Sequence, residues 1–157
     1  MLRVTVPENV APGRVLSWAL NNTDPVQLRC RSGERIAFSA SQNFRIIQAK
    51  GSLGPWRVST AAYYYSIETV EGQEILQYHW HPEDTGGIDY PHLHLGAAAG
   101  KLRADLASAH VRTSRVSLEY VLEMLIEDFG VRARGQSEWR SRLRKAHRKF
   151  REARSWS

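Results

Sequence analysis

The chain has 157 residues, of which 42% are apolar, and it carries a formal net charge of +6 at pH 7. This length and composition predict one domain over residues 1–157 and exclude the fibrous and intrinsically disordered classes. The single cysteine, Cys30, excludes an internal disulfide and a cysteine-rich zinc site.

The opening residues, MLRVTVPENVAPG, lack the apolar stretch of a secretory signal peptide. No apolar run in the sequence is long enough to cross a bilayer. Because a lone cysteine also fits a reducing compartment, these features predict a cytoplasmic protein of bacterial type with no membrane partner.

Strand-like segments occupy the middle of the sequence. Residues 13–22, GRVLSWALNN, fit a strand or a helix equally well. Between residues 34 and 96, short β-type runs alternate with turns, which predicts an antiparallel sheet. RIAFSA and FRIIQA flank the polar residues SQN and predict a first hairpin. AYYYSIETV and QEILQYHWH flank Glu71 and Gly72, and the glycine permits the tight turn of a second hairpin.

A hairpin centred on that turn places only apolar and aromatic residues on its inner face, where Tyr63 meets Trp80. For the following strand we expect the one register that pairs apolar with apolar residues, Tyr78 with Leu95 and Trp80 with Leu93. The same register pairs His79 with His94 and His81 with His92. Because side chains alternate along a strand, this register places all four histidines on the face opposite the core.

Apolar residues recur at helical spacing over residues 114–129. This pattern predicts a helix with Thr113 or Ser114 as its N-cap and with Gly130 directly after its end.

A second, basic amphipathic helix is predicted over residues 136–154, docked through Trp139, Leu143 and Phe150. Strands followed by two helices predict the α+β class. We expect an antiparallel meander followed by two C-terminal helices packed on one of its faces.

Histidine is concentrated in residues 77–96, QYHWHPEDTGGIDYPHLHLG, which hold four of the six histidines as two His-x-His pairs. His110, before the first helix, can reach the same site, and Tyr64 is expected beside His79 on the neighbouring strand. These residues form the predicted catalytic set: His79, His81, His92, His94, His110 and Tyr64.

Three interpretations of the histidines remain open. Imidazoles can act as general acid and base in phosphodiester cleavage without a cofactor, with Arg112 and Arg115 holding the phosphate. Alternatively, neutral imidazoles, with Glu83 nearby, can bind a divalent metal such as zinc. The residues of this second interpretation are His79, His81, His92 and His94. In the third, the histidines are polar residues of a half-exposed sheet without a function of their own.

The positive charge is concentrated in residues 132–157, which hold ten Lys or Arg against two Glu. Such an asymmetry predicts RNA, another polyanion or an acidic protein as partner, although a solvated helix gives the same pattern. Three arginines of the second helix are the candidates for binding a substrate backbone: Arg140, Arg144 and Arg148.

The run YYYSIETVEGQEILQYHWHPEDTGGIDYPHLHLG resembles the centre of the TumE-like toxins of bacterial toxin–antitoxin pairs. The shared layout is a Tyr-rich strand, a short Gly turn, a second strand and a Pro-His-x-His element before helices. The resemblance covers roughly residues 60–130, and His92 and His94 match the Pro-His-x-His element. Where that family commonly has Arg and Asp before the loop, this chain has Tyr78 to His81. The resemblance implies an RNA-directed toxin neutralised by a cognate antitoxin protein.

These observations predict a small toxin-like enzyme that cleaves RNA by acid–base chemistry of clustered histidines. The alternative is a non-enzymatic module. Its Arg-rich C-terminal helix would bind nucleic acid or a protein partner, and its histidines would be structural or would hold a metal.

Overall fold

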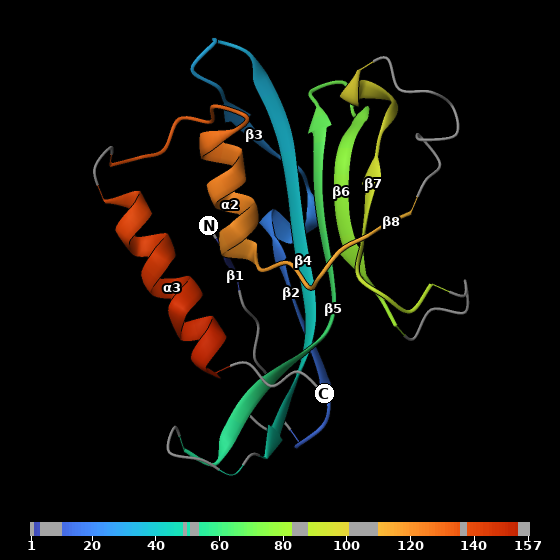
Figure 1. Ribbon diagram of the computed structural model, residues 1–157, viewed down its shortest axis with the longest axis vertical. Coiled ribbons are helices and arrows are strands. Elements are labelled where there is room, and N and C mark those ends of the chain that lie inside the picture. Colours follow the sequence, from blue (N-terminus) through green and yellow to red (C-terminus); the bar gives the residue numbers. More distant parts are fainter. Residues whose placement is uncertain are drawn as a thin grey trace.

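The computed structural model describes residues 2–3, 11–48, 50, 54–82, 88–100, 110–135 and 138–153. Within them the chain forms an eight-stranded antiparallel sheet followed by two α-helices (Figure 1). The strands are β1 (Leu2–Arg3), β2 (Val15–Leu20), β3 (Val26–Arg29), β4 (Arg35–Gln48), β5 (Trp56–Thr69), β6 (Glu74–Trp80), β7 (His92–Leu95) and β8 (Val111–Arg112). The helices are the 3₁₀ turns η1 (Asn21–Thr23) and η2 (Ala97–Ala99), then α2 (Leu118–Glu127) and α3 (Trp139–Ala153).

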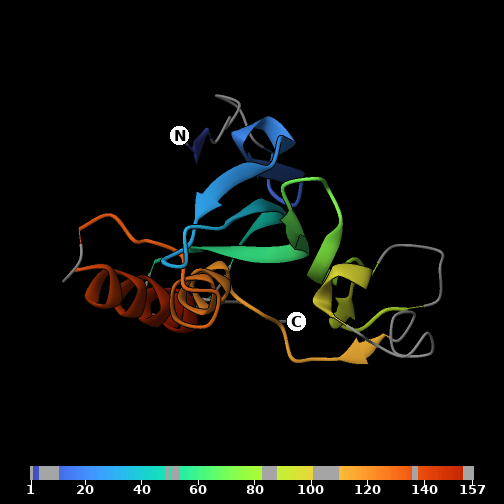
Figure 2. The same ribbon diagram turned by 90° about the horizontal axis from the view of Figure 1, so that it is seen from above.

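The sheet is a meander from β4 onward, in the order β1-β2-β4-β5-β6-β7-β8, and β3 also pairs with β4. Figures 1 and 2 show α2 and α3 side by side on one face of the sheet, with β7 and β8 at its far end. This arrangement confirms the predicted α+β class. No helix in the described part of the chain is long and apolar enough to span a membrane.

The predicted hairpin around SQN is wrong, because β4 runs unbroken through these residues. Its polar side chains are satisfied within the sheet: the indole of Trp18 donates to Gln42 at 2.9 Å, and Ser17 donates to Asn43 at 2.7 Å. No residue of this stretch is a glycine or proline, so nothing forces a turn. The ambiguous segment 13–22 contains strand β2 and the start of η1.

The second hairpin has the predicted register. Tyr63 pairs with Trp80 and Tyr65 pairs with Tyr78. The rings of Tyr63 and Tyr65 stack at 5.1 Å between centroids, and both side chains are buried. They pack with the buried apolar face of α2, so the core lies between β5, β6 and this helix.

Helix α2 begins four residues later than the predicted helix 114–129. Its N-cap is Ser117, not Thr113 or Ser114, and the Ser117 hydroxyl accepts a hydrogen bond from the backbone N–H of Tyr120. Residues 113–117 are extended because β8 pairs with β7 just before them and Val116 N–H donates to the buried Tyr63 hydroxyl at 3.1 Å. The helix ends at Glu127, two residues before the predicted end, so Gly130, with a φ of 69°, lies beyond the C-cap Asp128 and not directly after the helix.

Helix α3 lies inside the predicted range 136–154, whose residues 136, 137 and 154 are outside the described part. Of the predicted docking residues, Leu143 and Phe150 line cavities between α3 and α2, and Trp139 is half-buried at the helix start.

Gly96, directly after β7, lies against β6. Its N–H donates to the Ile75 carbonyl at 2.9 Å, and a Cβ added at this position would overlap the backbone carbonyl of Glu74. The end of β7 can therefore approach β6 this closely only because residue 96 has no side chain.

We predict that Gly96→Ala destabilises the protein by about 1–3 kcal/mol, because the new methyl must displace backbone. Thermal unfolding measures this as a decrease in Tm of roughly 2–12 °C for a chain of this size. Ala97→Ser, at the exposed neighbouring position, is the matched control and should leave Tm within about 1 °C. An unchanged Tm for Gly96→Ala would contradict the close approach.

Candidate functional site

The pairing of β6 with β7 brings the histidines together, in a register that differs from the predicted one by two residues. His79 lies opposite His92, and Gln77 lies opposite His94. The predicted pairs His79–His94 and His81–His92 are therefore wrong.

The shift preserves the face of every side chain, because strand alternation has a period of two. Tyr78 meets Leu93 and Leu76 meets Leu95, so apolar residues again face one another on the core side. All four histidines lie on the opposite face, as predicted.

His110 joins them from the residue before β8. We call His79, His81, His92, His94 and His110 the histidine cluster. The shortest separations between ring centroids are 4.0 Å for His79–His92, 4.4 Å for His94–His110 and 4.5 Å for His79–His94. The His92 ring is central to the cluster and only 1% exposed, whereas His110 is exposed at its edge.

A backbone carbonyl fixes the tautomer of His92. The Nδ1 atom of this ring lies 2.8 Å from the Tyr90 carbonyl oxygen, which can only accept, so Nδ1 carries the proton. The Nε2 atom is then the lone-pair nitrogen. A second short contact, 3.0 Å, joins Nε2 of His81 to Nδ1 of His79.

Among the buried ring nitrogens without a hydrogen-bond partner in the described residues are Nε2 of His79, His92 and His94. A buried polar atom without a partner costs roughly 1–3 kcal/mol, so three in one place require an explanation. A metal ion bound by imidazole lone pairs in this cluster supplies one.

The cluster also favours neutral rings. Burial, reinforced by the neighbouring imidazoles, lowers the pKa of His79 to about 3. The pKa of His94 is lowered for the same two reasons. Burial lowers the pKa of His92 as well, against the opposing effect of the hydrogen bond to the Tyr90 carbonyl. Near pH 7 these rings are therefore uncharged and able to act as ligands.

Two groups of three histidines have ring nitrogens close enough together to bind a metal ion. In the first, His79, His81 and His92 bring one nitrogen each within 4.8 Å of one another, and in the second His92, His94 and His110 do the same. Three imidazoles with further open positions are typical of catalytic zinc sites. Because His92 offers a single lone-pair nitrogen, both groups depend on the same atom.

Of the other predicted residues near the cluster, Tyr64 lies opposite His79 on β5, and its ring meets the His79 ring edge-on at 6.4 Å. Its hydroxyl accepts a hydrogen bond from Gln77 at 2.8 Å. Tyr64 thus borders the cluster without entering its centre. Glu83, which the sequence places near the predicted metal ligands, lies outside the described residues.

The arginines divide between the two faces of the sheet. Arg112 is opposite His92 on β8, and its guanidinium lies 3.9 Å from the centre of the Tyr90 ring, beside the cluster. Arg115 stacks instead on the Trp80 ring, on the core face, at 3.7 Å.

The helix arginines are remote from the cluster. Arg140, Arg144 and Arg148 belong to α3, which lies beside α2 on the core side of the sheet (Figure 2). Strand alternation places the histidines on the other face. Arg140 is paired with Glu127 of α2 at 2.9 Å.

Two contributions escaped the sequence interpretation. The Tyr90 backbone carbonyl, which orients His92, carries no side-chain signal. Ser117 and His147 form a 3.1 Å contact between the α2 N-cap and α3, although they lie 30 residues apart. Only the three-dimensional packing of the helices reveals this pair.

We predict that, without metal, the free energy of unfolding falls as the pH is lowered below about 6.5. Between 6.5, the ordinary pKa of His79, and about 3, its folded value, the unfolded chain binds an additional proton. The lowered pKa values of His92 and His94 act in the same direction.

Urea unfolding in chelator at pH 7.5, 6.5, 5.5 and 5 measures this loss, since carboxyl groups remain largely ionised over that range. The His79→Gln variant should show a shallower dependence on pH than the wild type. Equal stability of the wild type across the series would show that these rings protonate as readily in the folded protein as in the unfolded chain.

Comparisons with known proteins found no matching family model, no matching curated protein and no matching solved structure.

Proposed function

We propose that this protein binds one divalent transition-metal ion in the histidine cluster and uses it to cleave RNA. The observation that carries the proposal is that His92, whose buried Nε2 atom has no partner among the described residues, belongs to two groups of three histidines whose ring nitrogens lie within 4.8 Å of one another. Neutral imidazole is a common ligand of zinc and related ions.

The lowered pKa values favour this version over metal-free acid–base catalysis. A metal-free mechanism needs one charged ring to protonate the leaving oxygen while a second, neutral ring accepts a proton. His79, His92 and His94 are held neutral near pH 7, so none of the three is a good proton donor there. A metal ion supports phosphodiester cleavage without a charged imidazole, because it activates bound water and stabilises developing negative charge.

The site has an open side and a cation beside it. His110 is exposed at the edge of the cluster, and the exposed Arg112 lies across from the buried His92. A guanidinium in this position suits a phosphate group, which it binds through two parallel N–H donors. A chain with a single cysteine needs no oxidising compartment, so we place this activity in the cytoplasm.

A second candidate is an RNA-binding module that holds a structural metal and cleaves nothing. One observation favours it: α3, which carries seven basic residues, lies on the core side of the sheet, and the histidines are on the other face. RNA that follows this helix would not thereby reach the cluster. In both candidates the antitoxin-like partner implied by the resemblance remains a prediction.

We predict that apo-protein binds zinc with a stoichiometry of one per chain, because both histidine groups need the His92 Nε2 atom. Isothermal titration calorimetry with Zn²⁺ measures this. His92→Gln should weaken binding at least about 100-fold, since a ligand is lost. His147→Gln changes the one histidine outside the cluster and should keep the wild-type affinity. Wild-type zinc affinity in His92→Gln would overturn the metal site.

We predict that the zinc-loaded protein cleaves single-stranded RNA, that chelator abolishes cleavage, and that added zinc restores it. Arg112→Gln should lower kcat/KM by roughly 10–100-fold, as expected for loss of one phosphate contact. Cleavage that persists in chelator would support the acid–base mechanism instead. Zinc binding without cleavage of any RNA would support the binding module.

A further inference from the structure

A second concave region lies on the core face of the sheet, away from the histidine cluster. It is a cavity of about 470 Å³ between β6, the extended residues 113–117, and helices α2 and α3. Its volume falls in the range of roughly 300–1,000 Å³ typical of small-ligand sites. We call it the inner cavity. Its lining residues are Tyr78, Thr113, Ser114, Arg115, Val116, Ser117, Tyr120, His147, Phe150 and Arg151.

The charged side chains that line the inner cavity are all positive. The lining contains two arginines, Arg115 and Arg151, together with the hydroxyl groups of Thr113 and Ser114, and no carboxylate. The Thr113 hydroxyl is buried and has no hydrogen-bond partner among the described residues. Such a set of donors fits an anion, and guanidinium groups fit a phosphate best.

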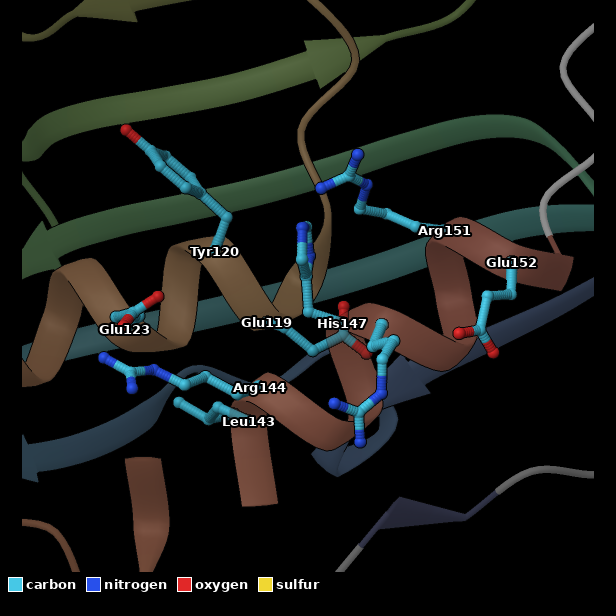
Figure 3. Close-up of a pocket in the computed structure, with 9 residues that line it drawn as sticks. Glu119, Tyr120, Glu123, Leu143, Arg144, His147, Arg151 and Glu152 are labelled. Carbon is cyan, nitrogen blue, oxygen red and sulfur yellow. The ribbon is translucent and has the colours of Figure 1, made fainter. Parts of the chain in front are cut away.

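A neighbouring cavity of about 560 Å³ shares part of this lining, but its charged side chains are of both signs. Figure 3 shows it between α2 and α3, where Glu119, Glu123 and Glu152 accompany the arginines. In the same view, the His147 ring and the Arg151 guanidinium project from α3 toward the coil that precedes α2. Arg151 thus lines both cavities, whereas the three carboxylates line the neighbouring cavity and not the inner one.

The remaining wall of the inner cavity is aromatic, from Tyr78, Tyr120 and Phe150. Tyr120 is 51% exposed, although most large apolar side chains of α2 are buried or partly buried. An exposed aromatic ring beside cationic groups is a typical platform on which a nucleobase stacks. A phosphate alone would not need this wall.

The His147 ring is oriented by the N-cap of α2. Ser117 accepts from the Tyr120 N–H, and its hydroxyl proton can be donated to Nδ1 of His147 at 3.1 Å. In that arrangement Nε2 carries the ring proton and is a further donor at the cavity wall.

We propose that the inner cavity binds a nucleotide, with its base against the aromatic wall and its phosphate at Arg115 and Arg151. The nucleotide is either free in solution or one unit of a single-stranded RNA. The site goes beyond the proposed metal chemistry, because it shares no residue with the histidine cluster and needs no ion.

Calorimetric titration with AMP, in chelator, tests this directly. Arg151→Gln should weaken AMP binding about tenfold, the loss expected for a charge-assisted hydrogen bond. Tyr120→Ala should weaken it to a similar degree through lost stacking. Lys149→Gln is the matched control, because it removes the same charge from α3 at an exposed position outside the cavity.

Competition identifies the source of the nucleotide. If an uncleavable single-stranded oligonucleotide binds more tightly than AMP and is displaced by it, the natural ligand is a unit of RNA. If AMP binds and the oligonucleotide does not compete, the ligand is a free nucleotide.

Three outcomes would overturn the proposal: no AMP binding by folded protein, equal weakening by Lys149→Gln, or full competition by inorganic phosphate with no effect of Tyr120→Ala. Thermal unfolding of each variant shows whether it is folded. Arg151→Gln should also keep the wild-type affinity for zinc, so failure of the metal site and failure of the nucleotide site can be told apart.

Discussion

The alternation of side chains along β6 and β7 determines both the core and the candidate site. Tyr78 and Trp80 pack in the core with α2, and Leu93 shares their face of the sheet because it lies opposite Tyr78. The residues next to them along both strands are histidines, which lie on the other face. The hydrophobic effect holds the first set inside, and the backbone then holds the imidazoles against one another on the other face. The unfavourable proximity of the rings is thus maintained by packing on the opposite side of the same strands.

This constraint explains what the sequence could and could not predict. Hydrophobic alternation identifies the face of a residue, so the grouping of His79, His81, His92 and His94 was correctly predicted. A shift of two residues leaves every face unchanged, so alternation cannot distinguish His79–His92 from His79–His94 pairing. In the actual register Gly96 lies directly against β6, a close approach of the folded backbone that the alternation of side chains does not reveal.

Other differences have similar local causes. Polar side chains at residues 41–43 suggested a turn, but partners on β2 and β5 satisfy two of them within a continuous strand. The start of α2 was predicted too early because several Ser and Thr residues near it are equally good caps in sequence. The hydrogen bond from Val116 to the buried Tyr63 keeps the chain extended up to Ser117. In each case a long-range contact decided between alternatives that were locally equivalent.

The extended stretch of residues 110–117 has a consequence for how the two sites can change. Its first residue, His110, belongs to the histidine cluster, and its last five residues line the inner cavity on the other side of the sheet. The stretch is fixed by β8 at one end and by the α2 cap at the other. An insertion or deletion here would displace groups on both faces at once. The number of residues between His110 and Ser117 therefore constrains the geometry of both sites at once.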